Sequence, residues 1–131
     1  MKMIRTFVYG TLKRGYGNHH WLNGIDYSTG KVYDSQFLGT GKVNAELQLG
    51  YLPYLYRKDG EAIGEVYLIP EPIYNHIKNM ECGAGYYEEE IDVTMLDGTV
   101  EKDCKVFFHS GKLYGSCEQS QIIKEYGVDK H

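Results

Sequence analysis

Residues 4–15 read IRTFVYGTLKRG, an apolar segment followed at once by a glycine-rich exit. The first part, Ile4 to Tyr9, is rich in β-branched and aromatic residues and predicts a buried strand. Glycine at position 10 then permits backbone conformations that other residues avoid. Successive backbone N–H groups in such a turn can converge on an anion. The residues Tyr9, Gly10, Thr11 and Leu12 are therefore interpreted either as an anion-binding loop or as a simple tight exit from the strand.

The remaining pattern predicts several strands and one main helix. Strands are expected at Lys31 to Leu38, Lys42 to Leu49, Pro53 to Arg57, Glu65 to Ile69, Tyr86 to Leu96 and Val100 to His109. Gly39-Thr40-Gly41 is expected to separate the first two strands, while the third and fourth form a hairpin, as do the last two around Asp97-Gly98. A helix is expected from about Glu71 to Met80, because proline suits its first turn and apolar residues recur at helical spacing. Shorter helical segments are expected at His19 to Leu22 and Gln119 to Tyr126.

This order of elements predicts a single α+β domain over residues 1–131, with a weakly patterned tail from residue 110. The sheet is expected to be small, mostly antiparallel and barrel-like, with one main helix. Thirteen tyrosines and sixteen glycines among 131 residues agree with a strand-rich chain that has many tight turns.

Composition and charge narrow the classes of partner. The formal net charge is −4 and the lysines and arginines are scattered, so nucleic-acid binding is not expected. No apolar run approaches the length that crosses a bilayer, and residues 1–5 lead into a strand pattern, so neither a membrane partner nor a signal peptide is expected. The cysteines Cys82, Cys104 and Cys117 are odd in number and contain no CxxC pair. They predict neither a disulfide framework nor a zinc site, and they favour a cytoplasmic location.

Glu81 ends the expected helix among apolar, glycine and tyrosine neighbours. Burial in such surroundings raises the pKa of a carboxyl group, and the negative end of a helix acts in the same direction. A carboxyl group with a raised pKa can serve both as base and as acid near neutral pH. The alternative is a solvated acid at a helix end, with no part in chemistry.

Three other groups of reactive residues have ordinary interpretations. Glu88-Glu89-Glu90 alternates between the two faces of a strand, so a solvated strand edge is favoured over a metal site. His19-His20 lacks the spacing of a metal site and suits a positioning or surface role. Cys82 is interpreted as a small packed thiol, because nothing in the sequence brings a histidine beside it to activate a nucleophile.

Taken in order, the loop and the glutamate resemble the gamma-glutamylcyclotransferase-like family, and most closely its gamma-glutamylamine cyclotransferase branch. The resemblance is carried by Tyr9 to Gly15 with Asn18-His19, by Gly64 to Tyr67, by the position of Glu81 and by Tyr87. It implies a small mixed β-barrel that uses no metal or cofactor. It also implies a reaction in which a gamma-glutamyl amine or amide gives 5-oxoproline and a free amine.

The resemblance also assigns roles to residues. Glu81 is the expected catalytic acid and base, the loop Tyr9 to Leu12 is expected to hold the substrate α-carboxylate, and Tyr87 is expected to orient the substrate or Glu81. Two other functions stay open: a non-catalytic carboxylate-binding protein on the same fold, and a cyclotransferase for glutathione or a biosynthetic gamma-glutamyl intermediate. The sequence indicates no oligomeric state and no leaving amine.

Overall fold

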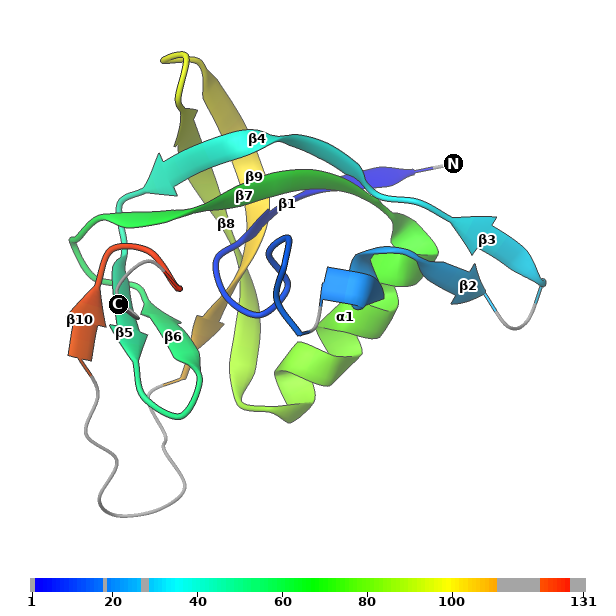
Figure 1. Ribbon diagram of the computed structural model, residues 1–131, viewed down its shortest axis with the longest axis horizontal. Helices are drawn as coiled ribbons and strands as arrows, with labels where there is room; N and C mark the ends of the chain where they lie inside the picture. The colour runs from blue at the N-terminus through cyan, green and yellow to red at the C-terminus, as the bar shows by residue number, and fades with distance from the viewer. Residues whose placement is uncertain (1, 18, 27–28, 111–120, 128–131) are drawn as a thin grey trace.

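The computed structural model describes residues 2–17, 19–26, 29–110 and 121–127. Five strands close into a barrel in the order β1-β7-β4-β8-β9, and one long helix lies beside it (Figure 1). The elements are β1 (Met3–Val8), η1 (His19–Leu22), β2 (Gly24–Asp26), β3 (Lys31–Tyr33), β4 (Gln36–Val43), β5 (Glu46–Leu49), β6 (Pro53–Tyr56), β7 (Ala62–Pro70), α1 (Glu71–Gly83), β8 (Tyr86–Met95), β9 (Val100–His109) and β10 (Gln121–Ile123).

Strand β1 closes the barrel. It pairs with β7 in antiparallel register from Met3 opposite Pro70 to Val8 opposite Glu65, and with β9 in parallel at Thr6. All the other barrel pairings are antiparallel, which confirms the predicted mixed, mostly antiparallel barrel with one main helix.

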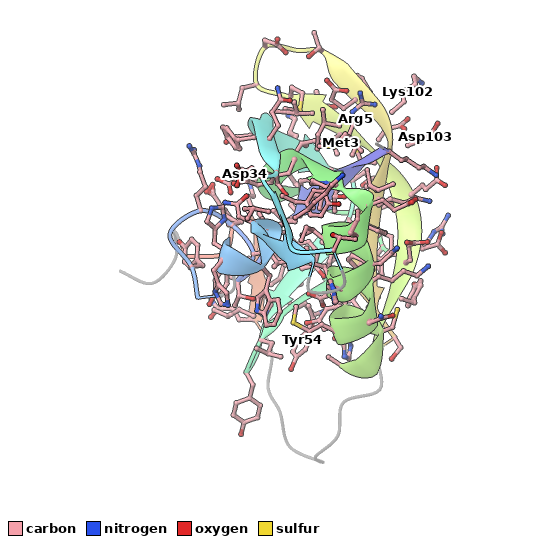
Figure 2. All side chains as sticks on the ribbon, turned by 90° about the vertical axis from the view of Figure 1, so that its right-hand side faces the viewer. Met3, Arg5, Asp34, Tyr54, Lys102 and Asp103 are labelled. Atoms are coloured by element: carbon pink, nitrogen blue, oxygen red, sulfur yellow. The ribbon has the colours of Figure 1, made fainter. Side chains whose placement is uncertain are left out.

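Side chains at the start of β1 alternate between exposed and buried, whereas its last three residues, Thr6, Phe7 and Val8, are all buried. Phe7 is 1% exposed and belongs to the hydrophobic core, together with Val66, Ile69 and Val106. Arg5 points outward, on the side of the molecule that also carries Lys102 and Asp103 of β9 (Figure 2). It forms an ion pair with Glu101 of β9, with Nε and Oε2 3.0 Å apart.

Helix α1 begins at Glu71, directly after β7, and packs against β8, β7 and β1. Its buried residues Ile73, Tyr74 and Ile77 lie on one face. The helix is three residues longer than predicted, because Glu81, Cys82 and Gly83 continue the last turn. The chain leaves it at Gly85, whose φ of +93° favours glycine. Glu81 therefore lies within the last turn of the helix.

The predicted break at Gly39-Thr40-Gly41 is wrong, because these residues lie inside the continuous strand β4. Gly39 accommodates a β-bulge with a φ of +147°. A Cβ atom on Gly41 would lie 2.5 Å from Val93 Cγ1, so glycine here permits close packing between β4 and the neighbouring strand β8.

The predicted hairpin between the strands beginning at Pro53 and Glu65 is also wrong. Strand β6 pairs with β5, and β7 pairs with β1 and β4, so the two strands on either side of Lys58-Asp59-Gly60 are not partners. The turn is real, but it connects the barrel to a separate three-stranded sheet.

The third member of that small sheet corrects another prediction. Residues Gln121–Ile123, expected within a short helix, form strand β10, which pairs with β5 and buries Ile123. Residues 119 and 120 of the expected helix lie outside the described part of the chain. The helical turn His19–Leu22 and the β8–β9 hairpin at Asp97-Gly98 are confirmed. In the residues that the structure describes, no helix has the length and apolar character to cross a membrane.

Candidate active site

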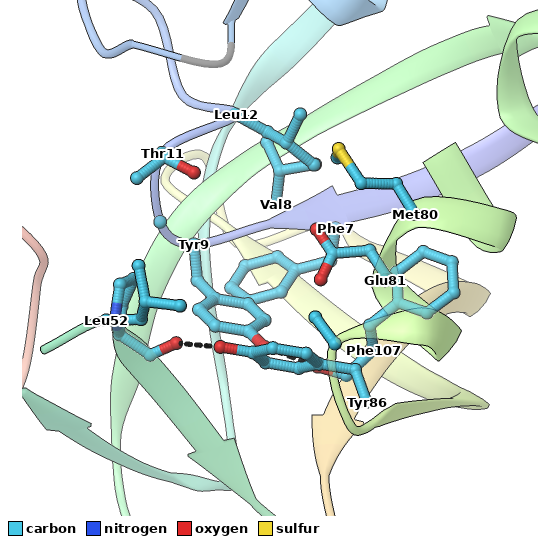
Figure 3. Close-up of a pocket in the computed structure, with 13 residues that line it drawn as sticks. Phe7, Val8, Tyr9, Thr11, Leu12, Leu52, Met80, Glu81, Tyr86 and Phe107 are labelled. Atoms are coloured by element: carbon cyan, nitrogen blue, oxygen red, sulfur yellow. Dashed lines mark hydrogen bonds between the residues drawn. The ribbon is translucent and has the colours of Figure 1, made fainter. Parts of the chain in front are cut away.

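A cavity of about 130 Å³ lies where the end of β1, the last turn of α1 and the turn before β6 meet (Figure 3). Its walls are largely apolar and aromatic. The lining residues are Phe7, Val8, Tyr9, Gly10, Thr11, Leu12, Leu52, Pro53, Met80, Glu81, Ala84, Tyr86 and Phe107. Glu81 is the one charged side chain among these thirteen described residues, so any charge-dependent chemistry in the cavity centres on it.

The glycine-rich loop forms one wall. Lys13 N donates to Gly10 O at 3.0 Å and closes a tight turn over Thr11 and Leu12. Gly10 packs directly on Pro53, since a Cβ atom at this position would lie 2.5 Å from Pro53 Cγ. The loop can therefore approach the β6 side of the cavity only because residue 10 has no side chain.

Two tyrosines make up another wall and are fixed by hydrogen bonds from their hydroxyl groups. Tyr9 OH donates to Phe107 O, and Tyr86 OH donates to Pro53 O at 2.7 Å. Burial raises the pKa of Tyr9 well above its ordinary value, and the nearby Tyr86 and Glu81 act in the same direction. Both rings are thus held in place, and Tyr9 stays a neutral hydroxyl at physiological pH.

The Glu81 carboxyl group points from α1 into this cavity (Figure 3). Burial raises its pKa from 4.5 to about 7. The cause is the one that its apolar and aromatic neighbours in the sequence indicate: a charged carboxylate is disfavoured where water is excluded. A group with this pKa exchanges protons readily in both directions near neutral pH.

The structure brings together five of the six residues that the sequence assigns to the site: Tyr9, Gly10, Thr11, Leu12 and Glu81. It does not bring Tyr87 to the cavity. Tyr87 is 38% exposed and packs on Phe108 with ring centroids 6.0 Å apart, whereas its neighbour Tyr86 lines the cavity. Successive residues of a strand face opposite sides, so only the register of β8 in the barrel decides which tyrosine faces the cavity.

The acidic residues Glu88-Glu89-Glu90, which follow Tyr87 on β8, each contact a basic or hydroxyl side chain. Glu88 accepts a hydrogen bond from Tyr74 OH and forms an ion pair with Lys78 at 3.5 Å. Glu89 pairs with Arg57 and Glu90 with Lys105, each at 3.0 Å. Within the described ranges, no three His, Cys, Asp or Glu residues are gathered in a way that could hold a metal ion.

The remaining candidate groups lie away from the cavity lining. Cys82 is exposed, Cys104 is buried with a thiol pKa raised to about 11 by that burial, and Cys117 lies outside the described residues. His19 contacts the loop from behind, with Nδ1 3.0 Å from Leu12 O. Because a carbonyl oxygen only accepts, the histidine donates and holds the loop backbone.

Sequence reasoning missed the apolar walls of the cavity. Phe7 and Phe107 come from different barrel strands, Leu52 comes from the β5–β6 turn, and Pro53 is the first residue of β6. Each reads as an ordinary core or turn residue, and none carries a local signal for a binding site. Their convergence depends on the barrel closing and on the small sheet packing beside it.

The fold and the cavity define a class: a small barrel enzyme whose cavity suits a small molecule and contains one protonatable acid. Comparison with known proteins gives the family. The family model described as gamma-glutamyl cyclotransferase, AIG2-like, matches residues 6–126, and the chain belongs to this family.

Individual proteins that resemble this chain support the same family assignment. A Drosophila melanogaster protein provisionally named a gamma-glutamylcyclotransferase is 32% identical over an alignment of 135 positions. The alignment covers 97% of this chain and 80% of that protein. The gamma-glutamylaminecyclotransferase of Mus musculus is 31% identical over 104 residues, which cover 72% of this chain and 66% of that protein. The crystal structure of an AIG2-like protein from Mus musculus superposes with a TM-score of 0.69 at 26% identity, covering 86% of this chain and 81% of the other.

Substitution of Gly10 by alanine tests the close contact in the loop. The added Cβ atom would meet Pro53, so the loop must move away from the cavity wall. A displacement of about 1 Å in a substrate-positioning element costs up to about 10²-fold. We therefore expect kcat/KM of the Gly10→Ala enzyme to fall about ten- to a hundredfold, measured by steady-state kinetics. Gly17→Ala is the matched control, because a Cβ atom there meets nothing within 4 Å. An equal loss in both variants would contradict this account.

Proposed function

We propose that this protein is a gamma-glutamyl cyclotransferase that converts a gamma-glutamyl amine or amide into 5-oxoproline and a free amine. The observation that carries the proposal is that Glu81, with a pKa of about 7, lines the same small cavity as the loop Tyr9 to Leu12. Membership of the family supports the general reaction, and the name of the mouse relative supports an amine leaving group.

The substrate supplies its own nucleophile. Its α-amine attacks its γ-carbonyl carbon, a five-membered ring forms, and the bond from that carbon to the leaving amine breaks. Because the reaction is intramolecular, the main task of the protein is to hold the cyclising conformer. Backbone N–H groups of the Gly10–Leu12 turn are suited to hold the α-carboxylate at one end of the substrate.

Glu81 balances the protons. The ionised carboxylate accepts a proton from the α-ammonium group, which frees the amine lone pair for attack. The resulting carboxylic acid then donates this proton to the departing amine, and the carboxylate is regenerated. The ring nitrogen keeps only one of the three α-ammonium hydrogens, so it releases a second proton, which the regenerated carboxylate accepts and passes to the free amine, which leaves as an ammonium ion. A pKa near 7 suits this role, because both forms of Glu81 are populated at neutral pH.

The direct test is incubation of the purified protein with a gamma-glutamyl amine such as gamma-glutamyl-ε-lysine, with gamma-glutamyl dipeptides, and with glutathione. We expect 5-oxoproline to appear, as measured by chromatography with mass detection, and to appear fastest with the amine substrates. Competition among the three in one reaction separates the leaving groups. Saturable binding of an unchanged carboxylate ligand without 5-oxoproline would instead identify a non-catalytic binding protein.

A further inference from the structure

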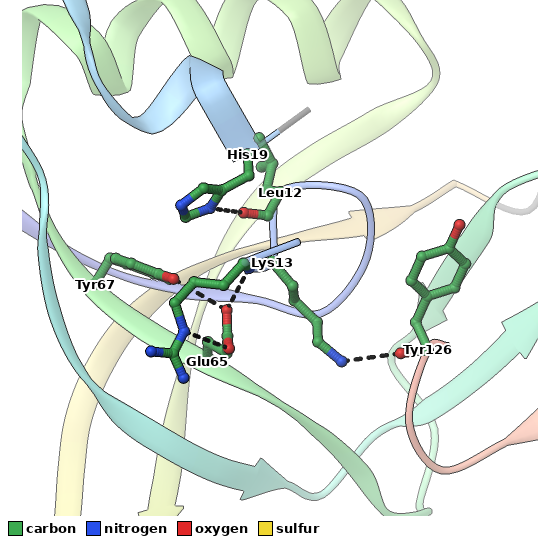
Figure 4. Close-up of polar contacts among 7 residues, drawn as sticks. Leu12, Lys13, His19, Glu65, Tyr67 and Tyr126 are labelled. Carbon is green, nitrogen blue, oxygen red and sulfur yellow. Dashed lines mark hydrogen bonds and ion pairs between the residues drawn. The ribbon is translucent and has the colours of Figure 1, made fainter. Parts of the chain in front are cut away.

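A buried carboxylate lies behind the cavity and has no part in the proton transfers proposed above. Glu65 on β7 has a side chain that is 10% exposed, and it is absent from the cavity lining. Its Oε1 accepts hydrogen bonds from Arg14 N at 2.8 Å and from Tyr67 OH at 3.0 Å, and its Oε2 lies 3.4 Å from Arg14 Nε (Figure 4). Burial of a carboxylate is costly unless several donors surround it, as they do here.

The partner of Glu65 is the backbone that directly continues the cavity loop. Arg14 follows Lys13, whose N–H closes the turn on Gly10 O. The Arg14 guanidinium is itself fixed between Glu65 and the ring of Phe37, 4.0 Å from the ring centroid. A rigid strand of the barrel thus holds both the backbone and the side chain of the residue that ends the loop.

Two further bonds hold the same loop from the side away from the cavity. His19 Nδ1 donates to Leu12 O at 3.0 Å, and Lys13 Nζ donates to Tyr126 O at 3.0 Å (Figure 4). These bonds run from the loop to η1 and to the segment after β10. Glu65 differs from His19 and Tyr126 because it accepts a backbone N–H of the segment that ends the loop, and its charge strengthens that bond.

We propose that Glu65 is a positioning residue, which sets the direction of the loop N–H groups through Arg14 and thereby the affinity for the substrate carboxylate. This inference rests on the proposed function of the loop. Glu65 contacts no substrate; it limits the backbone conformations open to residues 10–14 before the ligand arrives. A preorganised loop loses less freedom on binding and so binds more tightly.

The kinetic consequence is specific. The carboxylate of the substrate does not change during ring closure, so the loop binds the ground state and the transition state about equally. Loss of such uniform binding raises KM and leaves kcat nearly unchanged. A general loss of stability would not produce this split in the fraction of protein that remains folded.

The test compares four variants. Glu65→Leu removes the acceptor, and Glu65→Asp keeps the charge but draws the carboxylate back from Arg14 N. Glu65→Gln keeps one carbonyl oxygen for the bonds from Arg14 N and Tyr67 OH. Tyr67→Phe removes a different partner of Glu65 and leaves the loop bond in place. For each variant, kcat, KM, melting temperature and amide hydrogen exchange of residues 10–14 are measured.

We expect KM to rise about tenfold or more in Glu65→Leu and Glu65→Asp, because a hydrogen bond to a charged group contributes about 1.5–3 kcal/mol and each 1.4 kcal/mol is tenfold. The Arg14 amide should exchange at least about tenfold faster in these two variants. Glu65→Gln keeps an acceptor but loses the charge, so its rise in KM should be smaller than that of Glu65→Leu. Tyr67→Phe should keep KM and loop exchange within about threefold of the starting protein. Should Glu65→Leu fail to fold, Glu65→Asp carries the comparison.

Unchanged KM and unchanged loop exchange in folded Glu65→Asp would overturn the inference. An equal rise of KM in Tyr67→Phe would also overturn it, because that result assigns the effect to general packing. Failure of the proposed function has a different signature: the starting protein would then form no 5-oxoproline. In that event, calorimetric titration with L-glutamate as the carboxylate probe decides: weaker binding in Glu65→Asp supports positioning, and equal or absent binding overturns it.

Discussion

Replacement of Glu81 by glutamine is expected to lower kcat for 5-oxoproline formation by about 10²–10⁴-fold, the range that a positioned proton-transfer group contributes. Glutamine fills nearly the same space in the last turn of α1, but it neither accepts the proton of the α-ammonium group nor returns one to the leaving amine. Steady-state kinetics with a gamma-glutamyl amine measure the loss. Circular dichroism checks that the barrel is still folded.

The matched control for this change is Glu71→Gln. Glu71 stands in the first turn of the same helix, is partly exposed and pairs weakly with Lys2 at 3.8 Å, away from the cavity. Its replacement by glutamine should leave kcat within about twofold, because exposed ion pairs of this kind contribute little. Near-normal turnover in Glu81→Gln, or a similar loss in Glu71→Gln, would refute the catalytic assignment.

The same Glu81→Gln change is expected to stabilise the protein at pH 8 by about 2–3 kcal/mol. Burial raises the pKa of Glu81 to about 7 in the folded state, against 4.5 for the exposed group. A difference of one pKa unit between the folded and unfolded states corresponds to about 1.36 kcal/mol of folding free energy. The expected stabilisation is smaller than the full difference between the two pKa values implies, because water reaches part of the Glu81 side chain. Above pH 7, folding must bury a charge that glutamine does not carry.

The sign of the pH dependence follows from linkage. Between pH 4.5 and 7, the folded protein binds the Glu81 proton more strongly than the unfolded chain does, so its stability falls as pH rises through this window. The Gln variant lacks this contribution. Urea unfolding should therefore give nearly equal free energies for the two proteins below pH 4.5 and a widening difference up to pH 7. A difference that is constant from pH 4 to pH 8 would show that Glu81 is not protonated near neutrality.

Taken together, these expectations describe a residue that costs stability and provides activity. A carboxylate among Phe7, Tyr9 and Met80 lowers the stability of the folded protein, because its charge is buried. The same surroundings suit proton transfer, so stability and activity place opposite demands on this position. The same burial that raises its pKa therefore explains both predicted effects.

Elements with strong local patterns were predicted correctly from the sequence. The strand Ile4 to Tyr9 corresponds to β1 (Met3–Val8), and Asp97-Gly98 does connect β8 and β9. The helix was predicted with an early end because glycine and alanine follow Glu81, whereas the chain stays helical through Gly83. These signals act over a few residues, so they survive without knowledge of the rest of the fold.

Pairings between distant strands were not predicted. The residues around Lys58-Asp59-Gly60 have the composition of a hairpin turn, yet β7 pairs with β1 and β4, which lie far away in sequence. The glycines of β4 have the composition of a turn, yet Gly39 accommodates a β-bulge and Gly41 allows close packing against Val93. In each case, long-range packing in the barrel overrides a local preference.

Some residues of the candidate site were predicted from the sequence, and others were found only in the structure. Residue types and their order along the chain, together with a family resemblance, were enough to single out Glu81 and the loop Tyr9 to Leu12. They could not decide between Tyr86 and Tyr87, because a one-residue change of strand register exchanges the two faces. Nor did they separate Glu65 from the other acids, since only its contacts with Arg14 and Tyr67 distinguish it.

The sequence by itself determined the chemistry that is present: an acid at the end of a helix, a glycine loop after a buried strand, and the family to which both belong. The tertiary structure alone decided that the acid and the loop share one cavity, how strongly burial raises the pKa of Glu81, and which side chains form the walls. The reason is physical. Propensity and periodicity are properties of neighbouring residues, whereas desolvation, strand register and cavity shape arise when β1, α1 and the β5–β6 turn meet in space.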